Sequence, residues 1–105
     1  MKEHLANFHI AGLTYYDAVQ CFDQFKIGTQ IGMKVETENK YDARAVALYY
    51  NEYKIGFVPR AENRMLYKLI TLGHDASLEC RIQQLTPSEH PENQIRVVVH
   101  LLKAK

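Results

Sequence analysis

The chain has 105 residues, of which 47% are hydrophobic and 24% are charged, and its formal net charge at pH 7 is +1. This length and composition predict one globular domain with a modest core, and they exclude disordered and fibrous classes. The small net charge excludes a strongly basic arm that wraps duplex DNA through bulk charge, but it permits a local basic patch.

The sequence carries no signal for a membrane or for export. Its longest apolar runs fall far short of the roughly 20 residues that span a bilayer, so we expect no transmembrane helix and no membrane partner. The first residues, MKEHL, begin no apolar stretch long enough for a signal peptide, which predicts a cytoplasmic protein. In that compartment Cys21 and Cys80 are expected to be reduced residues that pack in the core.

Alternation of apolar and polar side chains predicts four strands in the first part of the chain. These strands are expected over residues 5–11, 31–37, 45–51 and 53–58. Asn51-Glu52 separates the last two strands and predicts a hairpin, which Pro59 ends. A short helix or an irregular turn is expected over residues 15–22.

The period changes to that of a helix over residues 61–72, and Gly73 is placed as its C-terminal cap. The inner face is predicted to consist of Met65, Leu66, Leu69, Ile70 and Leu72. The outer face is basic, since Arg64 and Lys68 are four residues apart and Arg60 lies one turn upstream. These three cations either form a patch that contacts a ligand or line a solvated helix face.

Two more strands are expected over residues 76–84 and 94–102, with a loop between them that contains Pro87 and Pro91. The predicted fold is therefore mainly β with one or two helices. Six short antiparallel strands of this kind favour a small β-barrel.

Two segments, residues 39–46 and 54–60, place an aromatic residue beside a charged or hydrogen-bonding residue at a strand end. A flat, phosphorylated ligand needs this combination, because it requires a ring for stacking and a charge for its backbone. The pattern predicts a binding site formed by both segments.

Three segments, AGLTYY (residues 11–16), NKYDARAV (residues 39–46) and IGFVPR (residues 55–60), resemble in order and spacing the signature of the HIRAN domain family. The match covers roughly residues 7–75. It implies a single HIRAN-like domain over residues 1–105, with an OB-like, mostly antiparallel six-stranded β-barrel and a packed helix. The family occurs alone in bacteria or fused to SWI/SNF-type helicases, and the fused members grip the 3′ end of single-stranded DNA.

The resemblance implies a non-catalytic module that binds single-stranded DNA at 3′ hydroxyl ends, in DNA repair or replication-fork processing. A helicase or nuclease partner would be encoded separately. Tyr15 matches a family aromatic that stacks on the terminal base, and Tyr41-Asp42 matches the pair around the terminal nucleotide and its 3′ hydroxyl. Arg60 matches a basic residue that contacts phosphate, and Asn39 matches a polar turn position beside the site.

Four further residues complete the predicted nucleic-acid site: Tyr16, Arg44, Phe57 and Arg64. Each has a structural alternative, because a ring can simply fill the barrel and an arginine can simply be solvated. For Asp42 the alternative is an Asx turn that holds the chain before the strand at residues 45–51.

Catalysis is not expected, because the sequence lacks the motifs of nucleotide hydrolysis, esterase and zinc-protease chemistry. The five histidines lack metal-ligand spacing with the cysteines, so neither a metal nor another cofactor is predicted.

The alternative function is a protein-interaction module that uses the same groove, or the tyrosines 49, 50 and 53 of the hairpin, without binding nucleic acid. This alternative is supported by the low net charge and by Thr14, which stands where DNA-binding members often have arginine. The last strand also lacks an aromatic near Ile95, where fused members offer a second stacking wall. The oligomeric state stays open.

Overall fold

The computed structural model describes residues 2–103, and of Tyr15 it describes the backbone alone. Six strands are present: β1 (Lys2–His9), β2 (Gln30–Val35), β3 (Val46–Tyr50), β4 (Tyr53–Phe57), β5 (Leu78–Leu85) and β6 (Ile95–Leu102). Two α-helices accompany them, α1 (Ala18–Cys21) and α2 (Asn63–Thr71). The prediction of a mainly β fold with six strands and one or two helices is confirmed.

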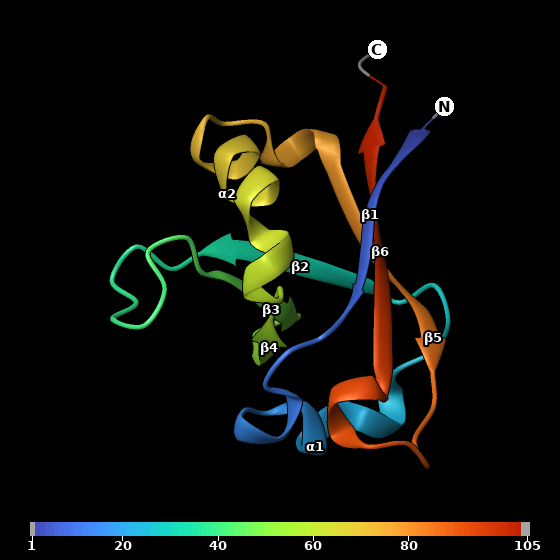
Figure 1. Cartoon of the computed structure of the whole chain (residues 1–105). Helices are drawn as coiled ribbons and strands as arrows, with labels where there is room; N and C mark the ends of the chain where they lie inside the picture. The colour runs from blue at the N-terminus through green and yellow to red at the C-terminus, as the bar shows by residue number, and fades with distance from the viewer. Residues whose placement is uncertain (1, 104–105) are drawn as a thin grey trace.

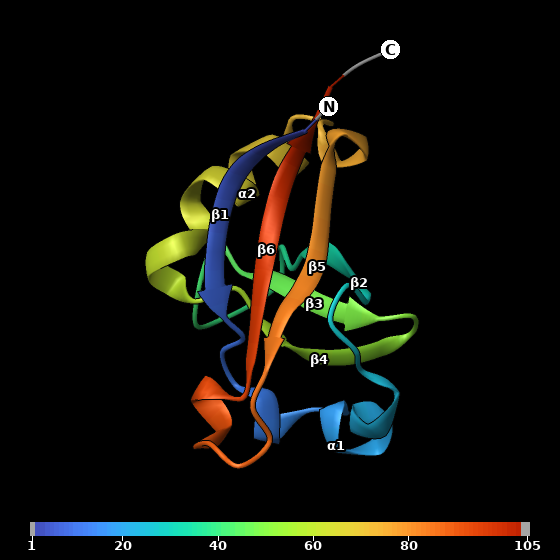
Figure 2. The same ribbon diagram turned by 90° about the vertical axis from the view of Figure 1, so that its right-hand side faces the viewer.

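The strands form one antiparallel sheet in the order β1-β6-β5-β2-β3-β4. Its two halves cross at a steep angle, with β1, β6 and β5 in one half and the β3–β4 hairpin with β2 in the other (Figures 1 and 2). They share a short pairing in which Gln30 lies opposite Arg81 and Ile31 opposite Cys80. The β2–β4 half and both α-helices lie toward one face of the β1-β6-β5 half (Figure 1).

The sheet is not closed into the predicted barrel. The segment after β1 meets the edge strand β4 through an isolated bridge between Ala11 and Phe57, in which each backbone N–H donates to the other's carbonyl at 2.9 Å. Closure depends on the angle between the two halves of the sheet, and the local strand pattern does not encode this angle.

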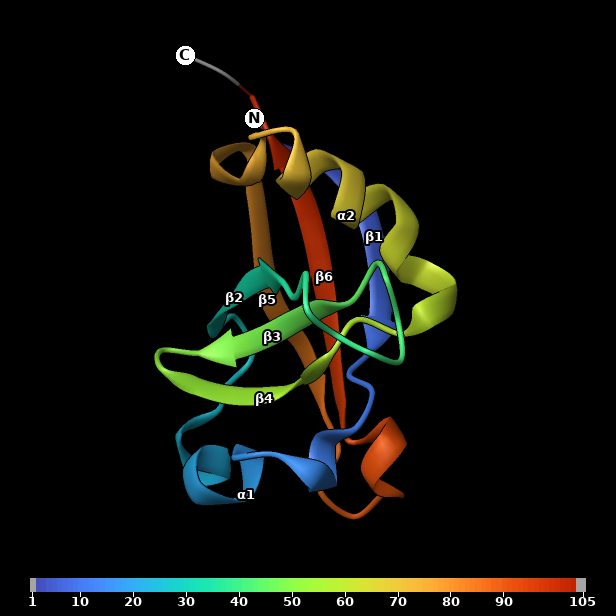
Figure 3. The ribbon, with the colours of Figure 1, turned by 90° about the vertical axis from the view of Figure 1, so that its left-hand side faces the viewer.

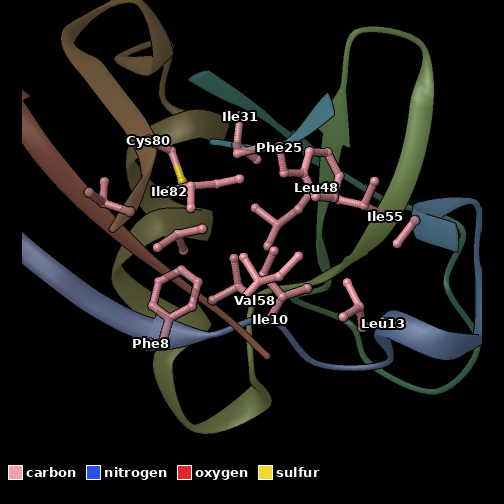
Figure 4. Packing of buried hydrophobic residues seen from close by; sticks show 14 of the residues in the cluster. Phe8, Ile10, Leu13, Phe25, Ile31, Leu48, Ile55, Val58, Cys80 and Ile82 are labelled. Carbon is pink, nitrogen blue, oxygen red and sulfur yellow. The ribbon is translucent and has the colours of Figure 1, made fainter. Parts of the chain in front are cut away.

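The hydrophobic core lies between the crossing halves (Figure 4). Phe8 and Ile10 come from the β1 side, and Leu48 and Ile55 come from the hairpin; all four are buried. Cys21 and Cys80 are also buried and carry free thiols, as predicted. Burial raises the pKa of Cys80 to about 12, so this thiol is a packing residue.

Helix α2 packs on the face of the β1-β6-β5 half that the hairpin also covers (Figure 3). The residues of its inner face differ from the predicted ones. Met65 is 48% exposed and Leu72 is 74% exposed, so their predicted inward placement is wrong. The inward row follows the spacing i, i+3, i+4, i+7 and consists of Asn63, Leu66, Tyr67 and Ile70. The rotation of the helix is set by Asn63, whose side chain is 1% exposed and hydrogen-bonded to a loop.

The end of α2 agrees with the prediction. Gly73 has a φ of 89°, its N–H donates to Ile70 at 3.0 Å, and the N–H of His74 donates to Leu69 at 2.8 Å. This is a Schellman cap, which requires a left-handed residue at the position of Gly73.

Several predicted boundaries shift. Strand β1 begins at Lys2 rather than at residue 5, and the helix predicted from residue 61 begins as a 3-10 turn at Arg60–Glu62. The predicted helical turn over residues 15–22 divides into a 3-10 turn, Leu13–Tyr15, and α1. In the part of the chain that the structure describes, no helix has the length and apolar character needed to cross a membrane.

Candidate functional site

The loop between β2 and β3 is organised by the side chain of Asn39. Its Oδ1 accepts hydrogen bonds from the backbone N–H groups of Tyr41, at 2.8 Å, and Asp42, at 3.0 Å. Its Nδ2 donates to Oε1 of Glu36 at 3.1 Å. Asn side chains favour such local turns because the amide oxygen can replace a backbone acceptor. The turn leaves the side chain of Tyr41 85% exposed.

Asp42 connects this turn to helix α2. Its Oδ1 accepts from the backbone N–H of Arg44 at 3.0 Å, which is the Asx turn that the sequence offered as an alternative. Its Oδ2 accepts from Nδ2 of the buried Asn63 at 2.7 Å. The carboxylate therefore has a structural role, whatever ligand it also contacts.

Arg60 holds the same turn from the other side. Its Nη2 donates to the carbonyl of Tyr41 at 2.7 Å, and its Nε lies 3.8 Å from Oδ2 of Asp42. The Arg60 side chain is nevertheless 72% exposed, so the positive charge remains in contact with solvent. This arrangement places a cation at the rim beside the exposed ring of Tyr41.

An aromatic wall faces the turn. Tyr16 and Phe57 pack edge to face, with ring centroids 5.4 Å apart and an interplanar angle of 67°. The segment that carries Tyr16 is attached to the edge of β4, because the N–H of Asp17 donates to the carbonyl of Lys54 at 2.9 Å. Together with the bridge between Ala11 and Phe57, this contact brings the first predicted segment against the third.

Lys54 and Glu36 form an ion pair behind this wall. The ammonium of Lys54 lies 4.8 Å from the Tyr16 ring centroid and 4.5 Å from that of Phe57. Burial raises the pKa of Glu36, but hydrogen bonds from Lys54 and Asn39 outweigh that effect, and the net pKa is lowered. Neither residue is among the nine predicted site residues, although Lys54 is the first residue of the segment at 54–60. The available signal was only the opposite charge of the two residues.

These elements enclose a groove of about 240 Å³. Six of the nine predicted site residues line it: Tyr16, Asn39, Tyr41, Asp42, Phe57 and Arg60. They come from all three segments, which confirms only that the segments lie together; their roles in binding stay a prediction.

The other three predicted residues stand apart from the groove. Arg44 and Arg64 are exposed and do not line it. Arg44 lies in the turn before β3, where its backbone N–H donates to Asp42. The stacking role predicted for Tyr15 rests on a side chain outside the described part of the structure.

Pro59 lines a larger groove of about 490 Å³, which shares Ala11 with the first groove. It contains none of the predicted site residues. Its rim has mixed charge, because Arg96 is accompanied by Glu62 and Glu92. Within residues 2–103, no group of three His, Cys, Asp or Glu side chains is placed to hold a metal ion.

Comparison with known proteins identifies the family and the fold. The model of the HIRAN domain family matches residues 4–101, a span that includes the whole groove. A crystal structure of a protein from Lactobacillus plantarum is similar, with a TM-score of 0.82, 19% identity, and coverage of 99% of this chain and 98% of that one. A crystal structure of the HIRAN domain of human HLTF gives a TM-score of 0.64 and 16% identity, covering 91% of this chain and 71% of that one. Among curated proteins, no significant match was found.

Proposed function

Because this chain belongs to the HIRAN domain family, we propose that it is a non-catalytic, cytoplasmic module that binds single-stranded DNA at 3′ hydroxyl ends. HIRAN domains are known as DNA-binding modules. The observation that carries the proposal is the groove, in which six residues predicted from three separate segments meet. The module would act in DNA repair or replication-fork processing, with a separately encoded helicase or nuclease as partner.

Among the rings that line the groove in the described part of the structure, that of Tyr41 is the best placed to stack on a base. It is 85% exposed, whereas Tyr16 and Phe57 pack against each other and against Lys54. Stacking on an aromatic side chain contributes about 1–3 kcal/mol per base and accepts any base. We therefore expect one dominant stacking contact and no sequence specificity.

Asp42 and Arg60 supply the preference for an end. Arg60 offers an exposed cation to a phosphate, while the neighbouring carboxylate repels a second one. Each carboxylate oxygen of Asp42 accepts one hydrogen bond within the protein and retains further acceptor capacity. A terminal 3′ hydroxyl can donate to that oxygen, but an internal or terminal phosphate cannot.

The test is fluorescence anisotropy at low salt with one labelled oligonucleotide, prepared with a 3′ hydroxyl or with a 3′ phosphate. We expect tighter binding of the 3′ hydroxyl form and a loss of about 5- to 150-fold in affinity for Tyr41→Ala, from the stacking contribution. Tyr49→Ala is the matched control, because Tyr49 lies in β3 and outside the groove. Equal affinity for the two ends, or unchanged binding by Tyr41→Ala, would contradict end recognition.

A protein-interaction module is the second candidate. The mixed charge of the larger groove favours it, since carboxylates at the rim suit the side chains of a protein better than phosphates. It predicts no oligonucleotide binding at low salt and a partner protein recovered by pull-down. Salt is held low in that assay because phosphate contacts weaken steeply as salt rises.

A further inference from the structure

Lys54 and Glu36 are half-buried charges next to the groove that do not line it. Their side chains are 24% and 28% exposed, so the pair lies within the molecule rather than at the tips of solvated side chains. The proposed function assigns them no role.

On one side, the ammonium of Lys54 contacts the aromatic wall. It lies over the ring of Tyr16 at 4.8 Å and over that of Phe57 at 4.5 Å. A cation over an aromatic face is attracted by the negative charge of the ring surface. Lys54 therefore fixes the position of both rings and occupies one face of each.

On the other side, the pair reaches the turn. Oε2 of Glu36 pairs with Lys54, and its Oε1 accepts from Nδ2 of Asn39 at 3.1 Å. Oδ1 of the same Asn39 amide accepts hydrogen bonds from the backbone N–H groups of Tyr41 and Asp42. An unbroken series of contacts thus joins the two walls of the groove.

We propose that Lys54 is a positioning residue for ligand binding, which acts through Glu36 and Asn39 to set the aromatic wall and the Tyr41–Asp42 turn at a fixed separation. This inference rests on the proposed function, since it concerns the same groove and the same terminal nucleotide. Lys54 does not itself touch the ligand.

The charge of Lys54, and not only its bulk, is required for this role. A neutral side chain of similar length would keep the packing on the rings but leave Glu36 half-buried without its cation, which is costly. Arginine would preserve both the ion pair and the contact with the rings. Lys54→Met and Lys54→Arg therefore separate charge from packing.

The affinity for the 3′ hydroxyl oligonucleotide should fall about tenfold in Lys54→Met and recover to within about twofold of the original in Lys54→Arg. The matched control is Lys34→Met, because Lys34 lies 4.8 Å over the ring of Tyr49 in a similar pair outside the groove. If Lys54→Met and Lys34→Met bind as tightly as the original protein, the positioning role is wrong while the proposed function stands.

A second measurement needs no ligand. The backbone amide NMR signals of Tyr41 and Asp42 should move in Lys54→Met and stay in place in Lys34→Met. Unmoved signals would overturn the inference even if the protein binds no DNA, so the two failures are distinguishable. If Lys54→Met does not fold, Glu36→Gln interrupts the same series of contacts and carries the same expectations for affinity and for the amide signals.

Discussion

Asp42 binds both its own turn and helix α2, so one side chain fixes the geometry of the groove and the rotation of the helix. The buried amide of Asn63 has its Nδ2 satisfied by this carboxylate at 2.7 Å. A buried polar group of this kind is stabilising only while its partner remains. The stability of the protein and the shape of the groove therefore depend on the same contact.

Replacing Asp42 with alanine should lower the free energy of unfolding by about 1–3 kcal/mol, because Asn63 is left buried without its acceptor. Urea denaturation followed by circular dichroism measures this change. Glu38→Ala serves as the control, since Glu38 is an exposed carboxylate in the same loop. Equal midpoints for the two variants would show that the link to Asn63 contributes little.

Residues whose contacts are local were predictable from the sequence, and residues with distant partners were not. The turn at Asn39 and Asp42 follows from side-chain chemistry within a few residues. Asn63 lies 21 positions from Asp42, and its inward placement could have been found only by extending the row of Leu66, Tyr67 and Ile70 one turn backward. The partners Lys54 and Glu36 are likewise joined only by the fold.

At the scale of elements, the groove depends on how closely the segment after β1 approaches β4. Gly56 permits this approach, since a Cβ at that position would lie 2.6 Å from the carbonyl oxygen of Ala11 and would also overlap the side chain of Ile10. Such an overlap with backbone requires the two elements to separate. The glycine in the IGFVPR segment is therefore a condition for the bridge between Ala11 and Phe57.

Gly56→Ala should destabilise the fold by about 1–3 kcal/mol, because the added methyl group has no free space. Thermal unfolding measures the loss, and binding of the oligonucleotide should weaken as the aromatic wall shifts. In Gly32→Ala the nearest atoms would lie 3.8 Å from the new Cβ, an ordinary contact, so this variant should be close to neutral. Similar losses in both variants would mean that the close approach to Ala11 does not determine the effect.

Elements that carry strong periodicity were predicted well, and their relative placement was not. The six strands, the hairpin and the Gly73 cap follow from alternation and turn chemistry. The six strands favoured a small barrel, but among residues 2–103 the ladder between β2 and β5 includes only Gln30 and Ile31 of β2, and the edges of the sheet meet at the single bridge of Ala11.

At the scale of the whole molecule, two ion pairs tie together distant parts of the chain. Lys54 and Glu36 join β4 to the end of β2, and Lys2 pairs with Glu79 at 3.1 Å across β6. Hydrogen bonding from Lys2 lowers the pKa of Glu79, and the pKa of Glu36 is lowered as well. A carboxylate with a lowered pKa in the folded state stabilises that state only while it is ionised.

The free energy of unfolding should therefore be steady near neutral pH and fall as the pH drops below the ordinary glutamate value of 4.5, through the lowered pKa values of the folded state. Urea titrations between neutral pH and pH 3 measure this slope. Glu36→Gln should be less stable at neutral pH and show a shallower acid dependence, whereas Glu52→Gln, at the exposed hairpin turn, should keep the original slope. An unchanged slope in Glu36→Gln would show that Glu36 does not contribute to the acid dependence of stability.

The bridge between Ala11 and Phe57 is also a weakly paired junction, or seam, at the groove. Two hydrogen bonds hold it, whereas β5 and β6 pair along eight-residue strands. Regions with few backbone hydrogen bonds open locally before the rest of a fold unfolds. Opening here would part the segment after β1 from the edge of β4 and leave β5 and β6 intact. A ligand that contacts Tyr16 on one side of the seam and Phe57 on the other would stabilise the seam by mass action, so that occupancy of the groove would oppose its local opening.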